Sequence, residues 1–309
     1  MKKTILGAFV ALLTLPLMAQ KSFFSINDLI PGGSSYYRNS VPENKYLVWW
    51  GDECIEQDIH ECRIVSKKDG SVQTLVTLEQ INEILQVADR GFVHHLYDTS
   101  FPYAEKSLVL ISDSSRRTLI DWKTKKVVWK ADLDPKASHE DWNKDSRSYA
   151  YTIDHNLFVL TADGKIHPVS SDGSIDLVYG ESVHRDECGI SKGTFWSPDG
   201  SLLAFYKMDQ SMVSKYPQVN ITLPNQTVGE DSRCATTSPD PYPMAGETSH
   251  KVYVGIFNPQ TDKTVYLNAG DPTDRYFTNI AWAPDGKRLY LIELNRDQNF
   301  GSLDEYDDS

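Results

Sequence analysis

Short apolar runs separated by polar turn residues follow one another along most of the chain. Their length and their content of β-branched and aromatic residues are typical of β-strands. Ten runs show the pattern clearly: Tyr46–Trp50, Leu108–Ile111, Arg117–Trp122, Val127–Trp129, Ala150–Ile153, Leu157–Leu160, Leu202–Tyr206, Val252–Phe257, Val265–Leu267 and Leu289–Glu293. Asp-Gly pairs lie between several runs, and this pair is a strong hairpin signal. The pattern predicts an all-β fold built from antiparallel hairpins.

One device occurs twice, a tryptophan followed by a tight turn and an apolar strand. The copies are Trp196-Ser197-Pro198-Asp199-Gly200 and Trp282-Ala283-Pro284-Asp285-Gly286. The tryptophans are 86 residues apart, which is close to two units of about 43 residues. Degraded copies surround Trp142 and Trp49. This repeat predicts a β-propeller whose blades are four-stranded antiparallel sheets, roughly five to six of them in this chain.

Three segments depart from the strand rhythm. Leu78–Ala88 has helical apolar spacing, and Thr77 and Gln80 can form a capping box in front of it. Ser25–Ile30 predicts a short turn of helix before Pro31-Gly32-Gly33. The stretch 209–248 is rich in Pro, Ser, Thr and Asn, and we interpret it as a long excursion from one blade.

The first nineteen residues have the features of a bacterial signal peptide. Lys2 and Lys3 precede an apolar run from Ile5 to Leu17, and Leu17-Met18-Ala19 is an acceptable cleavage site. The run is shorter than the roughly 20 residues that span a bilayer. We therefore expect a mature chain of residues 20–309 that is exported without a membrane span, to the periplasm, the medium or the cell surface; an uncleaved anchor is the alternative.

The net charge limits the classes of molecule that the chain can bind. The formal net charge is −12, and it becomes −14 once the two lysines of the signal peptide are removed. Such a chain repels nucleic acid and tolerates or attracts cationic peptides.

The four cysteines leave the disulfide state open. Export permits disulfides, and Cys54–Cys62 with Cys188–Cys234 is one of three pairings; free buried thiols are the alternative. No C-x-x-C pair is present, which disfavours a zinc site. We also expect no other metal site and no cofactor.

Four motifs in order resemble the dipeptidyl peptidase IV-like serine exopeptidases of the prolyl oligopeptidase clan. They are Phe24–Gly33, Gly193–Gly200 with Lys207-Met208-Asp209 downstream, Tyr242–Glu247 and Leu294–Asn299. The resemblance implies that residues 20–309 are part of an eight-bladed N-terminal propeller, which in this family covers an α/β-hydrolase domain. It also implies release of dipeptides from peptide N-termini by the complete enzymes. The match is loosest between residues 52 and 140.

The resemblance implies one binding site within this chain. In the family, two adjacent carboxylates ahead of the Trp-Ser-Pro turn bind the substrate α-ammonium, and Asp186 and Glu187 occupy these positions. Two carboxylates can accept the three N–H groups of an ammonium. The usual pattern is Glu-Glu-Phe, so Asp186 is one methylene shorter and Cys188 replaces the aromatic residue. A solvated acidic loop is the alternative. Arg116 and Arg117 are both candidates for the family's carbonyl-binding arginine.

Catalytic machinery is not expected in this chain. A hydrolase nucleophile elbow reads G-x-S-x-G, and no such pentapeptide occurs. We therefore predict no catalytic residue, no hydrolase domain and no peptidase activity of the chain alone. The favoured interpretation is the substrate-gating propeller region of an exported dipeptidyl peptidase, with peptides bearing a free N-terminus and a separately encoded hydrolase domain as partners. The alternative is a stand-alone periplasmic propeller that binds peptides or proteins without catalysis.

Overall fold

The computed structural model describes residues 23–33, 35–36, 46–97, 99–104, 106–220 and 235–307. The predicted signal peptide, residues 1–19, lies outside these ranges. The chain divides into two compact units, Met1–Leu47 and Val48–Ser309. The described part of the first unit contains the short helix α2 (Ile26–Leu29), as expected. Asp28 stabilises its first turn, since its carboxylate accepts hydrogen bonds from the backbone N–H and the hydroxyl of Ser25.

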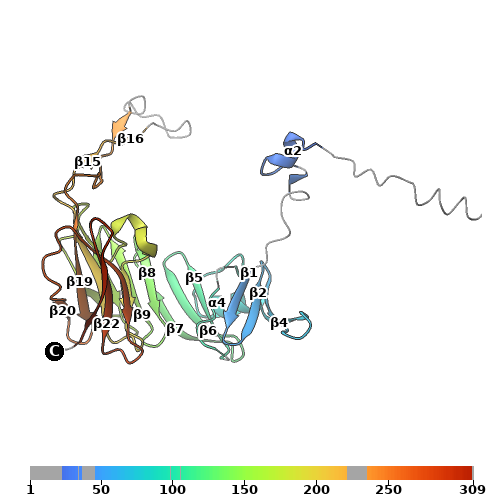
Figure 1. Cartoon of the computed structure of the whole chain (residues 1–309). Helices are drawn as coiled ribbons and strands as arrows, with labels where there is room; N and C mark the ends of the chain where they lie inside the picture. The colour runs from blue at the N-terminus through green and yellow to red at the C-terminus, as the bar shows by residue number, and fades with distance from the viewer. Residues whose placement is uncertain are drawn as a thin grey trace, which may run out of the picture. The chain divides into compact units, whose positions relative to one another are not determined.

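Five antiparallel sheets follow one another along residues 46–306 (Figure 1). The first holds β1 (Tyr46–Trp50), β2 (Glu53–Gln57), β3 (Glu61–Val65) and β4 (Val72–Thr77), and the second holds β5 (Leu108–Asp113), β6 (Arg116–Asp121) and β7 (Lys126–Asp132). The third holds β8 (Ser138–Asn143), β9 (Ser148–Ile153), β10 (Asn156–Leu160) and β11 (Ile166–Pro168). The fourth holds β12 (Leu177–Tyr179), β13 (Thr194–Trp196), β14 (Leu203–Asp209), β19 (Lys251–Asn258) and β20 (Lys263–Tyr266), and the fifth holds β21 (Arg275–Trp282), β22 (Leu289–Asn295) and β23 (Gly301–Tyr306). This is the predicted all-β architecture.

The hydrophobic core consists of four clusters, each between two consecutive sheets. Ile55 of β2 and Val109 of β5 belong to the first, and Leu119 of β6 and Tyr151 of β9 to the next. The third joins the third and fourth sheets, and the last joins the fourth and fifth. Sheets that stack face to face in chain order are the packing of propeller blades. The repeat therefore predicted the blade architecture correctly.

Strand β14 is apolar at consecutive positions because both of its faces are buried. Leu203 and Phe205 face the third sheet, whereas Ala204 and Tyr206 face the fifth. All four side chains are fully buried. A strand alternates its side chains between two faces, so a blade between two others must be apolar on both.

The repeated tryptophans form equivalent hydrogen bonds between neighbouring blades. Nε1 of Trp282 donates to the backbone oxygen of Phe195 at 2.8 Å, and Nε1 of Trp196 donates to that of Asp141 at 3.1 Å. Each acceptor immediately precedes the tryptophan of the preceding blade. Nε1 of Trp142 is buried and finds no such acceptor among the described residues. The two clear copies of the sequence repeat therefore form the same hydrogen bond to the preceding blade.

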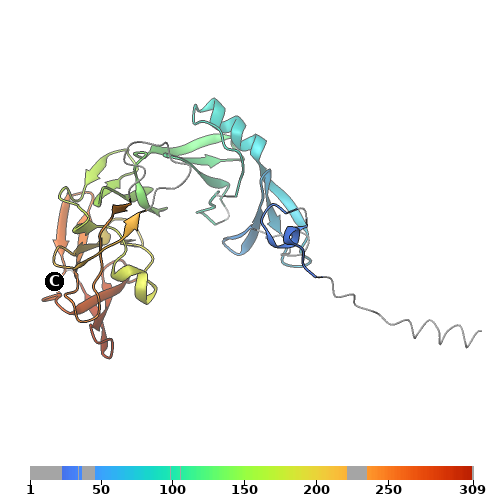
Figure 2. The same ribbon diagram turned by 90° about the horizontal axis from the view of Figure 1, so that it is seen from above.

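The segments outside the strand rhythm form as predicted. Helix α4 (Leu78–Val87) begins with a capping box between Thr77 and Gln80 and packs on β4 and β7 (cyan in Figure 2). The excursion after β14 contains a two-stranded ribbon, in which β15 (Lys215–Tyr216) pairs with β18 (Asp240–Pro241) and β16 (Val219–Asn220) pairs with β17 (Thr236–Thr237). Across the described ranges, no helix combines the length and apolar character needed to cross a bilayer.

The Cys54–Cys62 disulfide, one of the alternatives that the sequence left open, is not formed. Both thiols are free, and the hairpin register places Cys54 opposite Val65 and Cys62 opposite Gln57. The two cysteines are thus three positions out of register, about 10 Å along the strands, which is too far for a bridge. Cys62 is instead buried in the first core cluster. For the second pairing, Cys188 is exposed and Cys234 lies outside the described residues.

Candidate functional site

The acidic doublet lies in a loop that interrupts the first strand of the fourth sheet. β12 and β13 pair with the same edge of β14, and residues 181–192 leave the sheet between them; we call this segment the acidic loop. Tyr206 of β14 holds both ends of this loop: its carbonyl oxygen accepts from the N–H of Gly180, and its N–H donates to the carbonyl oxygen of Gly193. A Cβ at Gly193 would lie 2.1 Å from the carbonyl oxygen of Glu181. Glycine therefore allows the two ends of the loop to meet.

The acidic loop has an unusual backbone. His184, Arg185 and Asp186 have φ angles of 52°, 55° and 62°, a left-handed turn that costs roughly 1–2 kcal/mol per residue for side chains other than glycine. Such a conformation persists only where its surroundings fix it. Val183 and Ile190 are buried in the core between the fourth and fifth sheets, one at each end of the turn. The core thus anchors both sides of the strained turn.

Two hydrogen bonds tie the acidic loop to β21 of the next blade. Nδ2 of Asn279 donates to the carbonyl oxygen of Cys188 at 3.1 Å. Nε2 of His184 lies 3.1 Å from the carbonyl oxygen of Phe277. Because a carbonyl only accepts, His184 must carry its proton on Nε2. The loop is therefore positioned by two adjacent blades.

His184 also contacts a second buried histidine. Its Nδ1 lies 2.6 Å from Nε2 of His250, which precedes β19, and the two side chains are 6% and 4% exposed. Burial lowers the pKa of His184 to about 3, with the neighbouring His250 as a smaller cause. Burial and then the charge of Arg296 lower the pKa of His250 to about 4. Both imidazoles are thus neutral near pH 7.

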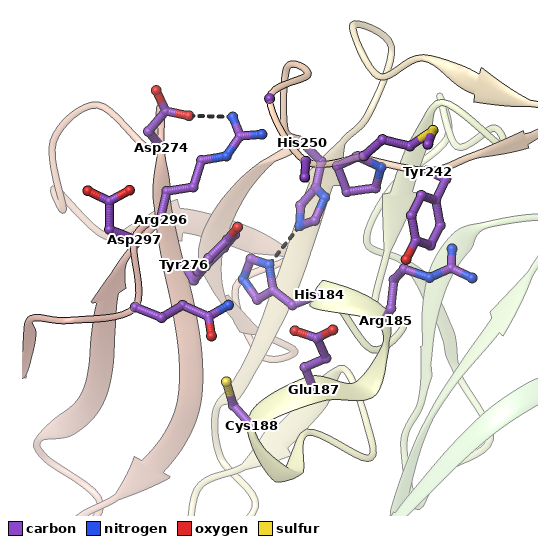
Figure 3. Close-up of a pocket in the computed structure, with 15 residues that line it drawn as sticks. His184, Arg185, Glu187, Cys188, Tyr242, His250, Asp274, Tyr276, Arg296 and Asp297 are labelled. Atoms are coloured by element: carbon purple, nitrogen blue, oxygen red, sulfur yellow. Dashed lines mark hydrogen bonds and ion pairs between the residues drawn. The ribbon is translucent and has the colours of Figure 1, made fainter.

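A cavity of about 550 Å³ lies over this histidine pair (Figure 3). Its walls come from the acidic loop, from residues 242–246 after the ribbon, and from Asp274, Tyr276 and residues 296–298 on the side of the fifth blade. Glu187 and Asp186 are both exposed, but only Glu187 lines the cavity. The structure therefore separates the two predicted carboxylates, and ammonium binding by either stays a prediction.

The arginines around the cavity already have anionic partners. Arg185 lies 3.3 Å from Asp240 and stacks on the Tyr242 ring at 4.6 Å. Arg296 lies 2.8 Å from Asp274 and donates to the carbonyl oxygen of Glu247. No cation of the described residues lies within ion-pair distance of the Glu187 or Asp297 carboxylate in the same cavity. The cavity therefore carries uncompensated negative charge.

The two arginine candidates lie elsewhere, on β6. Arg117 is buried and forms a bidentate pair with Glu140. Arg116 is 40% exposed at its side chain and pairs with Asp113. The structure therefore leaves the choice between them open. No cluster of three or more His, Cys, Asp or Glu side chains suited to a metal ion occurs in the described ranges.

His250 is the site residue that sequence reasoning missed. It lies between the Tyr242–Glu247 motif and an apolar strand, with no pattern of its own. The sequence therefore contains no signal that would pair it with His184. In the structure, residues of this motif and of the Leu294–Asn299 motif line the same cavity as Glu187.

Comparison with known proteins identifies the family of this chain. Residues 103–309, more than half of the chain, match the family model described as the dipeptidyl peptidase IV (DPP IV) N-terminal region. The chain belongs to this family. A curated relative from Uncinocarpus reesii, named probable dipeptidyl-aminopeptidase B, is 29% identical over 170 residues, which cover 51% of this chain and 18% of the relative.

Two solved structures extend the DPP IV comparison over most of the chain. A Bacteroides ovatus protein classed as a dipeptidyl aminopeptidase IV is 46% identical, with a TM-score of 0.81 over 92% of this chain and 38% of that one. Porphyromonas gingivalis dipeptidyl peptidase 4 has a TM-score of 0.65 over 93% of this chain and 40% of that one; at 18% identity it shows the fold alone. The DPP IV-type chain described here thus spans about two fifths of the solved chains.

Proposed function

We propose that this chain recognises the free N-terminus of a peptide, as the substrate-gating propeller region of an exported dipeptidyl peptidase IV-like serine peptidase. The observation that carries the proposal is the Glu187 carboxylate, which lines the cavity without a cationic partner among the described residues. Family membership supplies the class of substrate, a peptide with an unblocked amine. Export rests on the sequence of residues 1–19.

The electrostatics favour an ammonium ligand at Glu187. Arg185, two residues away in the same loop, is the nearest candidate to neutralise it, but Asp240 and the Tyr242 ring hold its guanidinium. The floor of the cavity consists of two neutral imidazoles. A bound α-ammonium therefore meets no unpaired cation. Because the Glu187 carboxylate is exposed, solvent screening reduces each charge-assisted hydrogen bond below the about 1.5–3 kcal/mol of a buried one.

Gating follows from where the amine is bound. A peptide whose N-terminus is fixed at Glu187 presents the peptide bond at a set number of residues from that end. A hydrolase domain, on the same or on a separate chain, then cleaves at that distance. Longer extensions beyond the amine meet the loop and the cavity wall, so the site counts residues from the N-terminus.

Calorimetric titration with a matched pair of peptides tests the proposal. One peptide has a free Gly-Pro N-terminus, and the other is identical but N-acetylated. We expect the wild-type chain to prefer the free amine, and Glu187→Gln to lose about 0.5–1.5 kcal/mol, roughly 2- to 13-fold in affinity, for the free amine only, since Glu187 is exposed. Asp186→Asn is the matched control and should change affinity less, because Asp186 lies outside the cavity lining. Equal binding of the two peptides to the wild-type chain would refute the proposal.

A further inference from the structure

The buried histidine pair takes no part in the proposed contact with the ammonium. It lies where the acidic loop meets the fifth blade, and its two rings are 4.8 Å apart between centroids. Neither side chain is needed to complete a strand ladder. Its position suggests that it serves the loop rather than the sheets.

The hydrogen bonds of the pair run in one direction. Phe277 accepts from Nε2 of His184, so a neutral His184 offers Nδ1 as an acceptor, and Nε2 of His250 must donate to it. One added proton can be shared along the N···N contact, but burial opposes it. A second proton sets two N–H groups against each other at 2.6 Å. The pair is therefore most stable when neutral, because burial opposes the first added proton and the two facing N–H groups oppose the second.

Of the charged groups around the histidine pair, Arg296 opposes protonation most directly. From the fifth blade, Arg296 disfavours a charge on His250, although Asp274 partly neutralises this arginine, and the Tyr276 ring stands edge-on to His184 at 4.8 Å. The remaining charged neighbours are exposed or already paired: Arg185, Asp186 and Glu187 of the acidic loop, Asp240 and Glu247 from the ribbon side, and Asp297 of the fifth blade.

We propose that His184 and His250 are positioning residues that hold the acidic loop in its binding conformation only while both are neutral, so that acid releases the loop and weakens amine binding. The consequence for binding rests on the proposed function, whereas the state of the loop does not. In the folded chain the pair is neutral at pH 7 and resists protonation. The released pair protonates near the ordinary histidine pKa of about 6.5, so release becomes progressively more favourable as the pH falls from about 6.5 toward the lowered pKa values of the folded pair, about 4 and about 3.

The first experiment needs no ligand. Imidazole ¹⁵N signals of the wild-type chain are followed from pH 7 to acid together with the backbone amides of residues 183–190. We expect both rings to be neutral with the proton on Nε2 at pH 7, and the loop amides to shift with the same midpoint as the imidazoles, below pH 6. A charged imidazole in the pair at pH 6.5, or loop amides that do not follow the pair, would overturn the inference.

The second experiment uses the conservative variant His250→Gln, whose Nε2 can donate to His184 without titrating. We expect affinity for the Gly-Pro peptide to fall at least about tenfold in the wild-type chain between pH 7 and 4.5, and markedly less in the variant. His60→Gln, an exposed histidine in the first blade, is the control and should follow the wild type. Identical pH profiles for the wild type and His250→Gln would contradict the inference. If no free-amine peptide binds at any pH, the proposed function fails, and the ligand-free experiment still decides the role of the pair.

Discussion

The guanidinium of Arg185 lies 3.3 Å from the carboxylate of Asp240, although 55 residues separate them in the chain. Asp240 belongs to β18 of the ribbon, so the excursion from the fourth blade holds the one arginine that lies within the acidic loop. This pair keeps a cation away from Glu187. The ribbon therefore contributes to the electrostatics of the cavity.

Asp240→Asn should weaken amine binding through Arg185. Once released, the arginine can turn toward Glu187, two residues along, and compete with the ammonium. We expect a two- to fivefold loss of affinity for a free-amine peptide, since an exposed ion pair contributes about 0.2–1 kcal/mol. Glu305→Gln breaks a similar exposed pair with Arg288 in the fifth blade and is the control. An Asp240→Asn chain that binds as the wild type does would show that the pair is not needed.

The hydrogen bonds of the repeated tryptophans predict that Trp282 and Trp142 contribute differently to the free energy of unfolding. Trp282→Phe removes a hydrogen bond to Phe195, whereas Trp142→Phe removes a buried N–H that has no partner among the described residues. Both changes lose the same ring area. We therefore expect Trp282→Phe to lower the free energy of unfolding by about 1 kcal/mol more than Trp142→Phe does. Urea denaturation checks this, and an equal or larger loss for Trp142→Phe would contradict it.

The two Pro-Asp-Gly turns offer another matched pair. Gly200 and Gly286 both have φ of 70°, but a Cβ at Gly200 would lie 2.3 Å from Oγ of Ser146, while at Gly286 the nearest atom is 3.7 Å away. Gly286→Ala should cost about 1–2 kcal/mol for the left-handed backbone alone. Gly200→Ala adds a clash with the turn of the third blade. In thermal unfolding, the melting temperature of Gly200→Ala should be lower than that of Gly286→Ala. The reverse order would contradict the contact between Gly200 and the turn of the third blade.

Thiol reactivity should distinguish the cysteines. Burial raises the pKa of the Cys62 thiol to about 11, so almost none of it is thiolate at pH 8. Cys188 is exposed at the cavity. We expect iodoacetamide to label Cys188 and spare Cys62 in the native chain, and a free-amine peptide to slow labelling of Cys188. Peptide mapping by mass spectrometry gives the rates; equal labelling of the two would disprove the burial argument.

Most of the fold was predictable because its signals are local. The Trp-turn-strand repeat, the Asp-Gly hairpin signal and the capping box at Thr77 each act within a few residues. The structure contains the repeat, the capping box and four of the five Asp-Gly hairpins; Asp172-Gly173 instead connects two different sheets. The Cys54–Cys62 pairing failed because it depended on the register of the hairpin, and a shift of three positions separates the thiols. Spacing alone does not determine register.

The cavity was less predictable because it is assembled across blades. The family resemblance predicted Asp186 and Glu187 together as the carboxylates that bind the substrate ammonium. The left-handed turn sends the two carboxylates to different surroundings, which no propensity of these residues indicates. His250 contacts His184 from 66 positions away, so only the packed fold brings the pair together.

A crystal structure of the chain with a free-amine Gly-Pro peptide tests the central claim most directly. The account predicts the ammonium nitrogen within about 3 Å of a carboxylate oxygen of Glu187, in the cavity above His184 and His250. A peptide bound with its amine away from Glu187, or bound in the same way by the Glu187→Gln chain, would contradict the account.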